Sequence, residues 1–258
     1  MSSSSCFCFS NLFSCRRSRK HNSKIVDEAN GVGNGPCIKK VFKVLAISGS
    51  LRNASCTHGL LRAAQKHAQN DPSLRMEIEI VSVDEMRSLP RLDPGLAVKN
   101  EKAGKGQNYY TYPAAVESFI KKVKAADCII FSCPEYNYSI TGVLKDALDW
   151  ACIGPDNAWT GKAAAIMAVG GQDARGCRGT YHLRQIGVKL DLNIINKELF
   201  ALHNPKSNEV IFDEKTGDLI DDQGSKNHPA AKINSRVKTI LAALLQFAEK
   251  FPIDHSSD

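Results

Sequence analysis

A segment rich in glycine and hydroxyl side chains follows the first apolar run of the chain. It reads Gly49-Ser50-Leu51-Arg52-Asn53-Ala54-Ser55, with Thr57 two residues later. A phosphate dianion is bound by bare backbone N–H groups, hydroxyls and often one cation. Gly49 permits a close approach, and Arg52 supplies a guanidinium. The hydroxyls are those of Ser50, Ser55 and Thr57. The segment therefore predicts a phosphate site, with an ordinary Ser/Gly turn as the alternative.

Two common nucleotide-binding loops do not match this segment. A nucleoside-triphosphate loop ends in Gly-Lys followed by Ser or Thr, and the chain has no such tripeptide. A dinucleotide loop needs G-x-G-x-x-G after a strand, and Leu51 interrupts that pattern. The glycines of Gly31–Gly35 have no strand before them and are interpreted as a linker. Neither class of ligand is favoured.

A second segment of polar and aromatic residues, Pro134–Gly142, follows the most apolar run, Cys128–Phe131. It begins with Pro134, Glu135, Tyr136, Asn137 and Tyr138. Two tyrosines offer a flat wall for a planar ring, and backbone N–H groups can meet the polar edge of that ring. A surface loop with solvent-facing tyrosines is the alternative. A phosphate site beside such a wall favours flavin mononucleotide (FMN) as the ligand.

Glycines recur in a third segment, Gly170–Gly179, after the apolar run Ala163–Val169. Gly170 and Gly171 permit close approach to the edge of a ring. Arg178 is a candidate to stabilise negative charge on reduced flavin, or to contact the phosphate of a nicotinamide donor. The alternative makes Arg178 a solvated loop cation, together with Arg175. We interpret His182, just beyond, as a packing or capping residue.

Apolar runs alternate with helical patterns through the body of the chain. The expected strands are Val41–Ile47, Met76–Val83, Cys128–Phe131, Ala163–Val169, and a last one drawn from Leu192–Ile195 and Glu198–Phe200. Five helices are expected. The first contains Leu60 to Ala68, the second starts at Pro113, and the others span Thr141–Cys152, Tyr181–Leu192 and Pro229–Phe251. Leu89–Tyr112 is expected to be a long polar loop, and Asn208–Gly224 a polar hairpin or excursion.

This alternation predicts an α/β fold: a doubly wound, five-stranded parallel sheet with helices on both faces. In such sheets ligands bind beyond the carboxyl ends of the strands. The three segments described above all follow strands, so they are expected to meet at that edge.

Composition excludes several classes of protein. The 34 Lys/Arg and 27 Asp/Glu give the chain a net charge of +7. Residues 1–40 hold seven of the basic and two of the acidic residues, so residues 41–258 carry a net charge of only +2. That body has no electrostatic footprint for nucleic acid. No run of about 18 apolar residues is present, which excludes a membrane-spanning helix. Nine scattered cysteines without a C-x-x-C pair argue against a disulfide framework or a metal site and favour a reducing, cytoplasmic setting.

The first 40 residues differ in composition from residues 41–251, the expected domain, and residues 252–258 are expected to be a tail. Ser2–Ser5 and three cysteines precede the basic cluster Arg16–Lys20. Three interpretations stay open for this extension. It is a disordered tail, a Ser/Arg-rich leader to a plastid or another organelle, or a membrane-surface anchor acylated at Cys6 or Cys8.

Three groups of residues together resemble the NADPH-dependent FMN reductase family, in particular its plant and bacterial NAD(P)H:quinone reductases, which include chromate and azo-dye reductases. The groups are Gly49-Ser50-Leu51-Arg52-x-x-Ser55; Pro134–Ser139 with Gly142-Val143-Leu144-Lys145-x-Ala147-x-Asp149-Trp150; and Tyr181-His182-Leu183-Arg184-Gln185. The similarity covers about Phe42 to Phe251.

The resemblance implies a flavodoxin-like fold, noncovalent FMN, NADPH or NADH as electron donor and a quinone-type acceptor. It also implies a homodimer or homotetramer whose interface borders the flavin. By motif position, Ser50, Arg52 and Ser55 bind the phosphate. The residues implied around the ring are Pro134, Glu135, Tyr136, Asn137 and Tyr138, with Gly170 and Gly171 approaching it. The flavin carries the chemistry, so no catalytic side chain is required.

Three departures from the family pattern bear on donor preference and rate. Thr57 stands where Asn is common, Gln172–Arg175 replaces a more glycine-rich stretch, and Lys189 replaces an apolar residue. Two other functions stay open: an FMN-binding electron carrier or redox-responsive interaction protein with little turnover, and a nucleotide-binding regulator of the same fold. The near-neutral body disfavours an obligate electron carrier, which usually has a strongly charged docking face.

Overall fold

The computed structural model describes residues 39–99, 110–153, 156–170, 176–202, 211–220 and 228–253, with only the backbone described for residues 198–202. Residues Lys39–Asp258 form one compact unit. Residues 1–38, which belong to the N-terminal extension with its three open interpretations, lie outside the described residues, as do residues 171–175 of the third segment.

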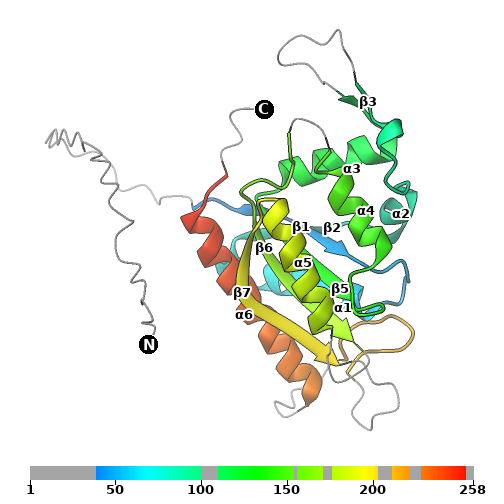
Figure 1. Ribbon diagram of the computed structural model, residues 1–258. Coiled ribbons are helices and arrows are strands. Elements are labelled where there is room, and N and C mark those ends of the chain that lie inside the picture. The colour runs from blue at the N-terminus through cyan, green and yellow to red at the C-terminus, as the bar shows by residue number, and fades with distance from the viewer. Residues whose placement is uncertain are drawn as a thin grey trace, which may run out of the picture. The chain divides into compact units, whose positions relative to one another are not determined.

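A five-stranded parallel sheet forms the centre of this unit (Figure 1). Its strands are β1 (Phe42–Ser48), β2 (Met76–Ile80), β5 (Cys128–Pro134), β6 (Ala163–Gly170) and β7 (Asn193–Leu202). Their spatial order is β2-β1-β5-β6-β7, and every pair is parallel. Counted along the chain, this is the order 2-1-3-4-5 of flavodoxin-like sheets, in which ligands bind where the strand order reverses. The predicted fold class is confirmed.

Helices cover both faces of the sheet. On one face lie α1 (Cys56–Asn70) and α6 (Pro229–Lys250). On the other lie α2 (Val83–Ser88), α3 (Ala114–Ala125), α4 (Gly142–Trp150) and α5 (Cys177–Lys189). Two short 3₁₀ turns, Pro72–Leu74 and Pro94–Leu96, and a small antiparallel pair complete the described elements: β3 (Val98–Lys99) with β4 (Tyr110–Thr111).

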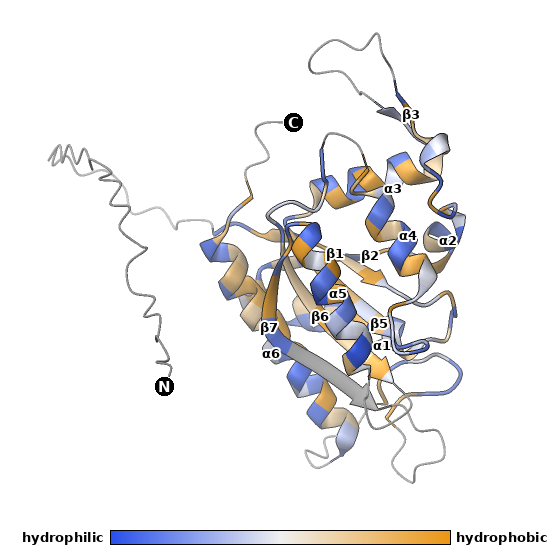
Figure 2. Ribbon diagram, in the orientation of Figure 1, coloured by the Kyte–Doolittle hydropathy of each residue, from blue (hydrophilic) through white to orange (hydrophobic). Residues whose placement is uncertain are grey.

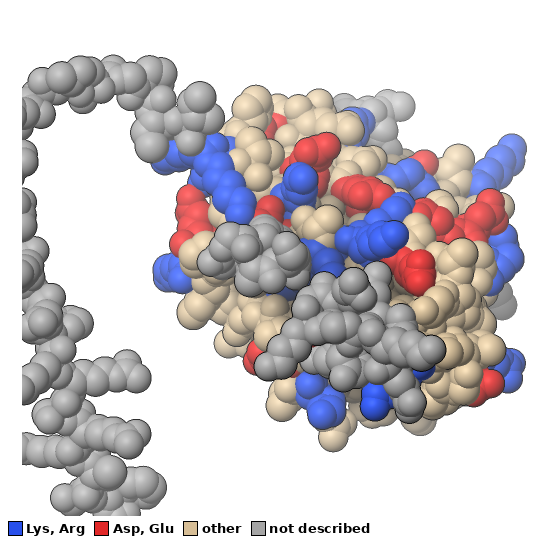
Figure 3. Space-filling view, turned by 90° about the horizontal axis from the view of Figure 1, so that it is seen from above, with Lys and Arg blue, Asp and Glu red and all other residues tan. Residues whose placement is uncertain are grey.

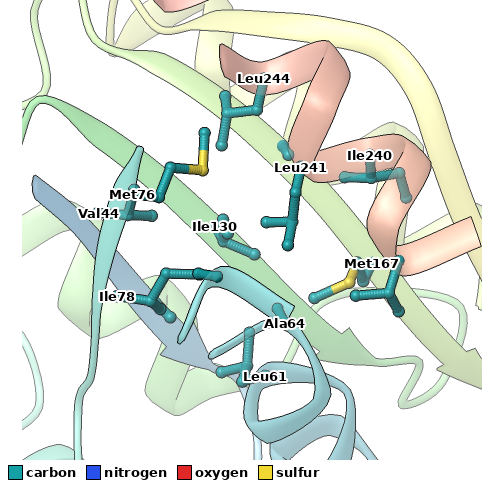
Figure 4. Close-up of a cluster of buried hydrophobic side chains, with 14 of the residues drawn as sticks. Val44, Leu61, Ala64, Met76, Ile78, Ile130, Met167, Ile240, Leu241 and Leu244 are labelled. Atoms are coloured by element: carbon teal, nitrogen blue, oxygen red, sulfur yellow. The ribbon is translucent and has the colours of Figure 1, made fainter. Parts of the chain in front are cut away.

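Each central strand supplies both cores because its side chains point alternately to the two faces. In β1, Val44 and Ala46 face α1 and α6, whereas Leu45 and Ile47 face the other helices. Figure 4 shows Leu61 of α1 and Leu241 of α6 converging on Ile130 of β5. The central strands are accordingly apolar along their length, while the helices carry polar residues on their outer sides (Figure 2). Burial on both faces explains why strands and helices were readable from the sequence.

The second strand is shorter than the sequence pattern predicts. It ends at Ile80, and α2 begins at Val83 where the expected strand continued. Ser82 is the N-cap of α2: its hydroxyl accepts from the Glu85 N–H, and the Glu85 carboxylate accepts from the Ser82 N–H. This capping box stops the strand, because it satisfies two N–H groups in helical geometry.

Three other boundaries are refined by the structure. Helix α5 begins at Cys177 and ends at Lys189, so the expected helix Tyr181–Leu192 is displaced toward the N-terminus. The two candidate segments for the fifth strand are one strand, β7, whose register shifts opposite Ala164 and Ile166. In the described part of the expected excursion, Phe212 pairs antiparallel with Leu219, as a hairpin requires.

Charged side chains are interspersed by sign on the described part of the face seen in Figure 3. Lysine and arginine lie next to aspartate and glutamate, as the near-neutral body predicts. Among the described residues, no helix is both long and apolar enough to span a membrane.

Candidate functional site

The segment after β1 places three hydroxyls together at the start of α1. Ser55 is the N-cap of α1, and its Oγ accepts from the Thr57 N–H at 3.3 Å. The Thr57 Oγ1 lies 2.7 Å from the Ser55 Oγ and 2.8 Å from the Ser48 Oγ. All three residues are buried. Because the first N–H groups of a helix have no intrahelical partner and carry partial positive charge, this arrangement places hydroxyls around a terminus that suits an anion. No acidic side chain stands in the first turn of α1.

Hydrogen bonds within the loop fix its curvature. The Ser50 N–H donates to the Ser48 Oγ at 3.2 Å, and the Ser50 Oγ accepts from the Arg52 N–H at 3.2 Å. The carbonyl of Ser50 lies 3.2 Å from the Nε2 of buried His58. Burial lowers the pKa of His58 below its usual 6.5, with nearby Arg62 acting in the same direction, while the hydrogen bond to Ser50 opposes the shift. A neutral His58 therefore supports the loop from beneath.

Two guanidinium groups flank the exposed side of the loop. Arg52 is exposed, and its Nη2 reaches the Ala54 carbonyl at 3.4 Å. Arg87 of α2 donates from its Nη2 to the Leu51 carbonyl at 3.1 Å. Arg87 also pairs with Asp84 at 2.6 Å, which offsets its charge. Arg52 is therefore the better placed of the two to meet an anion in the loop.

The first and second segments are joined directly. The Gly49 N–H donates to the Ser132 carbonyl at 2.8 Å, and the Gly49 carbonyl accepts from the Thr141 hydroxyl at 2.6 Å. A Cβ at Gly49 would lie 3.2 Å from both Pro134 Cδ and Thr141 Oγ1. Glycine therefore lets the β1 loop lie against the β5 loop, which places the predicted phosphate site beside the predicted ring wall.

The ring-wall segment contains a tight turn with its tyrosines in solvent. Tyr136 and Ser139 exchange two backbone hydrogen bonds of 3.0 Å, and Asn137 and Tyr138 between them have φ values of 49° and 67°. Two central residues with positive φ define a type I′ turn. The left-handed backbone is costly for Tyr138, and such strain concentrates at functional sites. Tyr136 and Tyr138 are 52% and 60% exposed, so their rings are available to a ligand.

Glu135 connects this turn to the third segment. Its carboxylate accepts from the N–H groups of Arg178 at 3.0 Å and Gly179 at 3.3 Å, and it pairs with the Arg178 guanidinium at 3.4 Å. A carboxylate at a helix N-terminus is stabilised by the helix dipole. The guanidinium of Arg178 lies 4.1 Å from the centre of the Tyr138 ring. The side chain of Glu135 thus holds the start of α5 against the tyrosine turn.

The structure brings most of the predicted residues to one edge of the sheet. Gly170 is the last residue of β6, directly after Val169, which pairs with Pro134 of β5 at this edge. Gly171 and Arg175 lie outside the described residues. His182 is exposed and contacts Ser139, with its Nδ1 3.0 Å from the hydroxyl; its interpretation as a packing or capping residue stays a prediction. Lys189 is the last residue of α5.

Sequence reasoning missed several residues that shape the site. They are Ser48, His58, Arg87, Ser132 and Thr141. Ser48 and Ser132 are paired in register as serines near the ends of two buried strands, where apolar residues are usual. That unusual residue type is the signal that was available from the sequence. Within the described residues, the Ser132 Oγ is buried without a hydrogen-bond partner.

These features fit an FMN phosphate and ring. The helix terminus, the hydroxyls and Arg52 match a dianion, and the orphaned Ser132 hydroxyl lies on the α1 side of the sheet beneath them. Exposed tyrosines on a rigid turn match a flat aromatic system. Among the described residues, no group of three His, Cys, Asp or Glu side chains is placed to hold a metal ion.

Comparison with known proteins agrees with this geometry. Residues 42–206 match the model of the NADPH-dependent FMN reductase family. An NAD(P)H:quinone oxidoreductase of Solanum tuberosum is 47% identical over 68% of this chain and 86% of its own length. A probable NADPH:quinone oxidoreductase of Oryza sativa is 43% identical over 81% of this chain and 93% of its own. A quinone reductase of Escherichia coli is 32% identical over 75% and 93%.

Solved structures agree on the fold. FerB, a flavoenzyme NAD(P)H:(acceptor) oxidoreductase from Paracoccus denitrificans, superposes with a TM-score of 0.62 at 22% identity, covering 82% of this chain and 99% of FerB. An NADH:FMN oxidoreductase in its apo form superposes with a TM-score of 0.51 at 23% identity, covering 78% and 89%. The match of the family model over most of the folded unit, and the identities shared with the plant proteins, show that this chain belongs to the NADPH-dependent FMN reductase family.

Proposed function

We propose that this protein binds FMN at the carboxyl edge of the sheet and transfers electrons from NAD(P)H to quinone-type acceptors. The observation that carries the proposal is the junction at Gly49. There the loop that leads to the N-terminus of α1 is hydrogen-bonded to Ser132 and Thr141, the residues on either side of the segment that carries the exposed Tyr136 and Tyr138. A mononucleotide with a large planar ring requires these two kinds of contact next to each other, one for its phosphate and one for its ring.

Each part of the site has a separate task. Bound FMN supplies the chemistry, since it takes up a hydride and gives up two electrons. The side chains of Ser50, Arg52 and Ser55, with Thr57 behind them, hold the phosphate. Pro134, Tyr136, Asn137 and Tyr138 and the main chain of Glu135 orient the ring, and Gly170 and Gly171 leave its edge accessible. Arg178 places positive charge next to Tyr138, where it favours an electron-rich ring.

The names of the relatives support the choice of donor and acceptor. The potato, rice and Escherichia coli relatives are quinone reductases, and the potato protein uses either nicotinamide cofactor according to its name. We extend the quinone acceptor and the NAD(P)H donor to this chain on that basis. One pocket that serves donor and acceptor in turn predicts ping-pong kinetics, so double-reciprocal plots should be parallel. Intersecting lines would contradict alternation at one pocket.

An absorbance spectrum of the purified protein, taken before and after NADPH is added, tests the proposal. We expect the visible bands of oxidised flavin, their loss on mixing with NADPH, and their return when a quinone follows. Stopped-flow mixing with NADPH and NADH in parallel gives the donor preference. A protein that stays colourless after FMN is supplied would refute cofactor binding. Flavin that binds but is not bleached by either donor would instead identify an electron carrier or interaction protein.

We also propose a homodimer or homotetramer in the cytoplasm. Tyr181 and Val188 are 63% and 82% exposed on α5, and exposed apolar side chains on one helix favour self-association. The scattered cysteines favour a reducing compartment. Residues 1–40 fused to a fluorescent protein test the location: diffuse signal supports the cytoplasm, whereas plastid or membrane signal would contradict it.

A further inference from the structure

The hairpin at residues 211–220 lies against the start of α1, although Asp218 and its partner Arg62 are 156 positions apart in the sequence. The hairpin is the orange loop in Figure 1. Arg62 of α1 donates from Nε to the Asp218 carboxylate at 2.5 Å and from Nη2 to the Thr216 carbonyl at 2.7 Å. The side chain of Phe212 is fully buried in the core under α1 and α6. The hairpin is therefore anchored both to the core and to the helix.

The hairpin also has its own internal bracing. The Asp213 Oδ1 accepts from the N–H groups of Lys215 at 2.9 Å and Thr216 at 2.8 Å. The Gly217 N–H donates to the Asp213 carbonyl at 2.8 Å, and the Asp213 N–H donates to the Asp218 carbonyl at 2.8 Å. These bonds hold Gly217 in a left-handed conformation with φ of 73°. The hairpin thus presents Gly217 to α1 on a fixed backbone.

The contact between hairpin and helix is backbone against backbone. A Cβ at Gly59 of α1 would lie 1.8 Å from the Gly217 carbonyl oxygen. A Cβ at Gly217 would lie 2.6 Å from the Ser55 carbonyl carbon and 2.8 Å from that of Ala54. Both partners must therefore be glycine for the surfaces to meet. Ser55 is the N-cap of α1, and Ala54 belongs to the proposed phosphate loop. The hairpin consequently supports that loop from the side of its last residues.

We propose that residues 211–220 are a clamp that holds the phosphate loop in its binding conformation. The affinity for the phosphate end of FMN, and not for its ring, then depends on the contact of Gly217 with Gly59 and Ser55. This inference rests on the proposed binding of the FMN phosphate by Gly49–Thr57. Gly217 and Asp218 are positioning residues, since they act through Ser55 and α1. The clamp explains why the chain makes an excursion between β7 and α6 that returns to α1.

The comparison of FMN with riboflavin isolates this effect, because riboflavin has the same ring and no phosphate. Dissociation constants of both are measured on the apoprotein by flavin fluorescence quenching or calorimetry. For Gly217→Ala we expect FMN binding to weaken at least about tenfold and riboflavin binding to stay within about twofold of wild type. Asp218→Ala, which removes the ion pair but adds no atoms, is expected to change FMN binding in the same direction by a smaller factor. Asp218→Glu should restore it in part.

Gly161→Ala is the matched control. Gly161 has a φ of 74°, close to that of Gly217, but a Cβ there meets only the Ile253 Cδ1 at 3.5 Å, and it precedes β6 at the opposite edge of the sheet. Gly161→Ala therefore introduces the same backbone strain as Gly217→Ala without a clash against α1. Equal weakening of FMN by Gly161→Ala, or loss of riboflavin binding together with FMN, would reduce the hairpin to general stability and overturn the clamp.

The outcome for wild type separates the clamp from the function on which it rests. If wild type prefers FMN to riboflavin but Gly217→Ala and Asp218→Ala keep that preference, the clamp alone is wrong. If wild type binds both flavins equally, the loop does not bind the phosphate, and the clamp falls with it. If Gly217→Ala does not fold, the FMN-to-riboflavin ratio of Asp218→Ala decides.

Discussion

The guanidinium of Arg178 lies 4.1 Å from the centre of the Tyr138 ring while its own helix, α5, is capped by the carboxylate of Glu135. Two segments that are separate in the sequence, Pro134–Gly142 and Gly170–Gly179, therefore meet at one cation. A guanidinium over an aromatic face is attracted by the ring quadrupole, and the Glu135 carboxylate orients it further. The arrangement keeps a positive charge beside the wall for the ring, yet leaves Tyr138 exposed for a ligand.

Replacement of Arg178 tests whether that charge serves electron transfer. Arg178→Ala should slow the bleaching of flavin by NADPH about ten- to a hundredfold, because a group that stabilises developing negative charge is lost. The FMN dissociation constant should change little. Arg178→Lys keeps the charge but not the planar stack, so its rate of bleaching should lie between those of wild type and Arg178→Ala. Stopped-flow absorbance gives the rates. Bleaching of Arg178→Ala at the wild-type rate would leave Arg178 a solvated cation.

Replacement of Arg52 tests the phosphate site itself. Arg52→Ala should weaken FMN binding by about 1.5–3 kcal/mol, as expected for the loss of a charge-assisted hydrogen bond. Riboflavin binding should not change. Lys66→Ala removes a positive charge from the exposed side of α1, the helix that follows the loop, and serves as the control for net charge. An FMN dissociation constant equal to that of wild type would mean that Arg52 is not a ligand.

The hydroxyls beneath the loop predict two changes of opposite sign. Thr57→Val removes the hydroxyl that lies between those of Ser48 and Ser55, so it should lower the free energy of unfolding of the apoprotein by about 1–3 kcal/mol. Ser132→Ala removes a buried hydroxyl that has no partner among the described residues, so it should be neutral or raise that free energy by roughly 1 kcal/mol. Urea denaturation of both variants measures this. A destabilised Ser132→Ala would reveal a partner for that hydroxyl.

Much of the fold could be predicted from the sequence because its strands are buried on both faces. Runs such as Cys128–Phe131 and Ala163–Val169 are apolar without interruption, and right-handed crossovers then leave few possible strand orders. The end of β2 was missed because the alternation of Met76–Val83 imitates a strand. The Ser82-x-x-Glu85 capping box, which overlaps the end of that run, was readable in the sequence and is the stronger signal for a boundary.

The candidate site was only partly predictable, because its supports are long-range. The β1 loop, the tyrosine turn and Gly170 follow their strands in the sequence, so topology alone brings them together. The carboxylate of Glu135, in contrast, caps a helix 43 residues away, and Gly217 fits against Gly59 only in three dimensions. No spacing in the sequence encodes either contact. The structure is therefore needed to identify what such a residue contacts, even where its residue type stands out in the sequence.

The buried His58 predicts an acid-sensitive apoprotein. Burial lowers its pKa in the fold below the 6.5 of an unfolded chain, so the unfolded state binds the proton more readily. The contribution of neutral His58 to the free energy of unfolding is therefore fully present above pH 6.5, and it is lost as the pH falls through the lower pKa of the folded state. His58→Gln, which can still donate to Ser50, should flatten the decline. Asp71, with a pKa of about 2, acts only at lower pH, since an ordinary Asp titrates at 3.8.

Thermal unfolding of the apoprotein at a series of pH values checks this expectation. As the pH falls from 6.5 to the lower pKa of folded His58, wild type should lose stability more steeply than His58→Gln; near pH 4, where carboxylates titrate, the two should lose stability in parallel. His67, which contacts Asn234 at the surface of α1, provides the control variant His67→Gln. If wild type and His58→Gln show the same pH dependence, the proton is not taken up at His58.

Val188 predicts the face through which the protein self-associates. It and Tyr181 lie two turns apart on α5, so both project from the same side of the helix. Val188→Glu would bury a charge in an apolar contact and should weaken self-association at least about tenfold, with the mass moving toward that of the monomer. Light scattering after gel filtration measures the mass. Val41→Glu, at a residue 55% exposed near the amino end of β1, is the control and should keep the wild-type mass. A monomeric wild type, or an unchanged mass for Val188→Glu, would place the interface elsewhere or remove it.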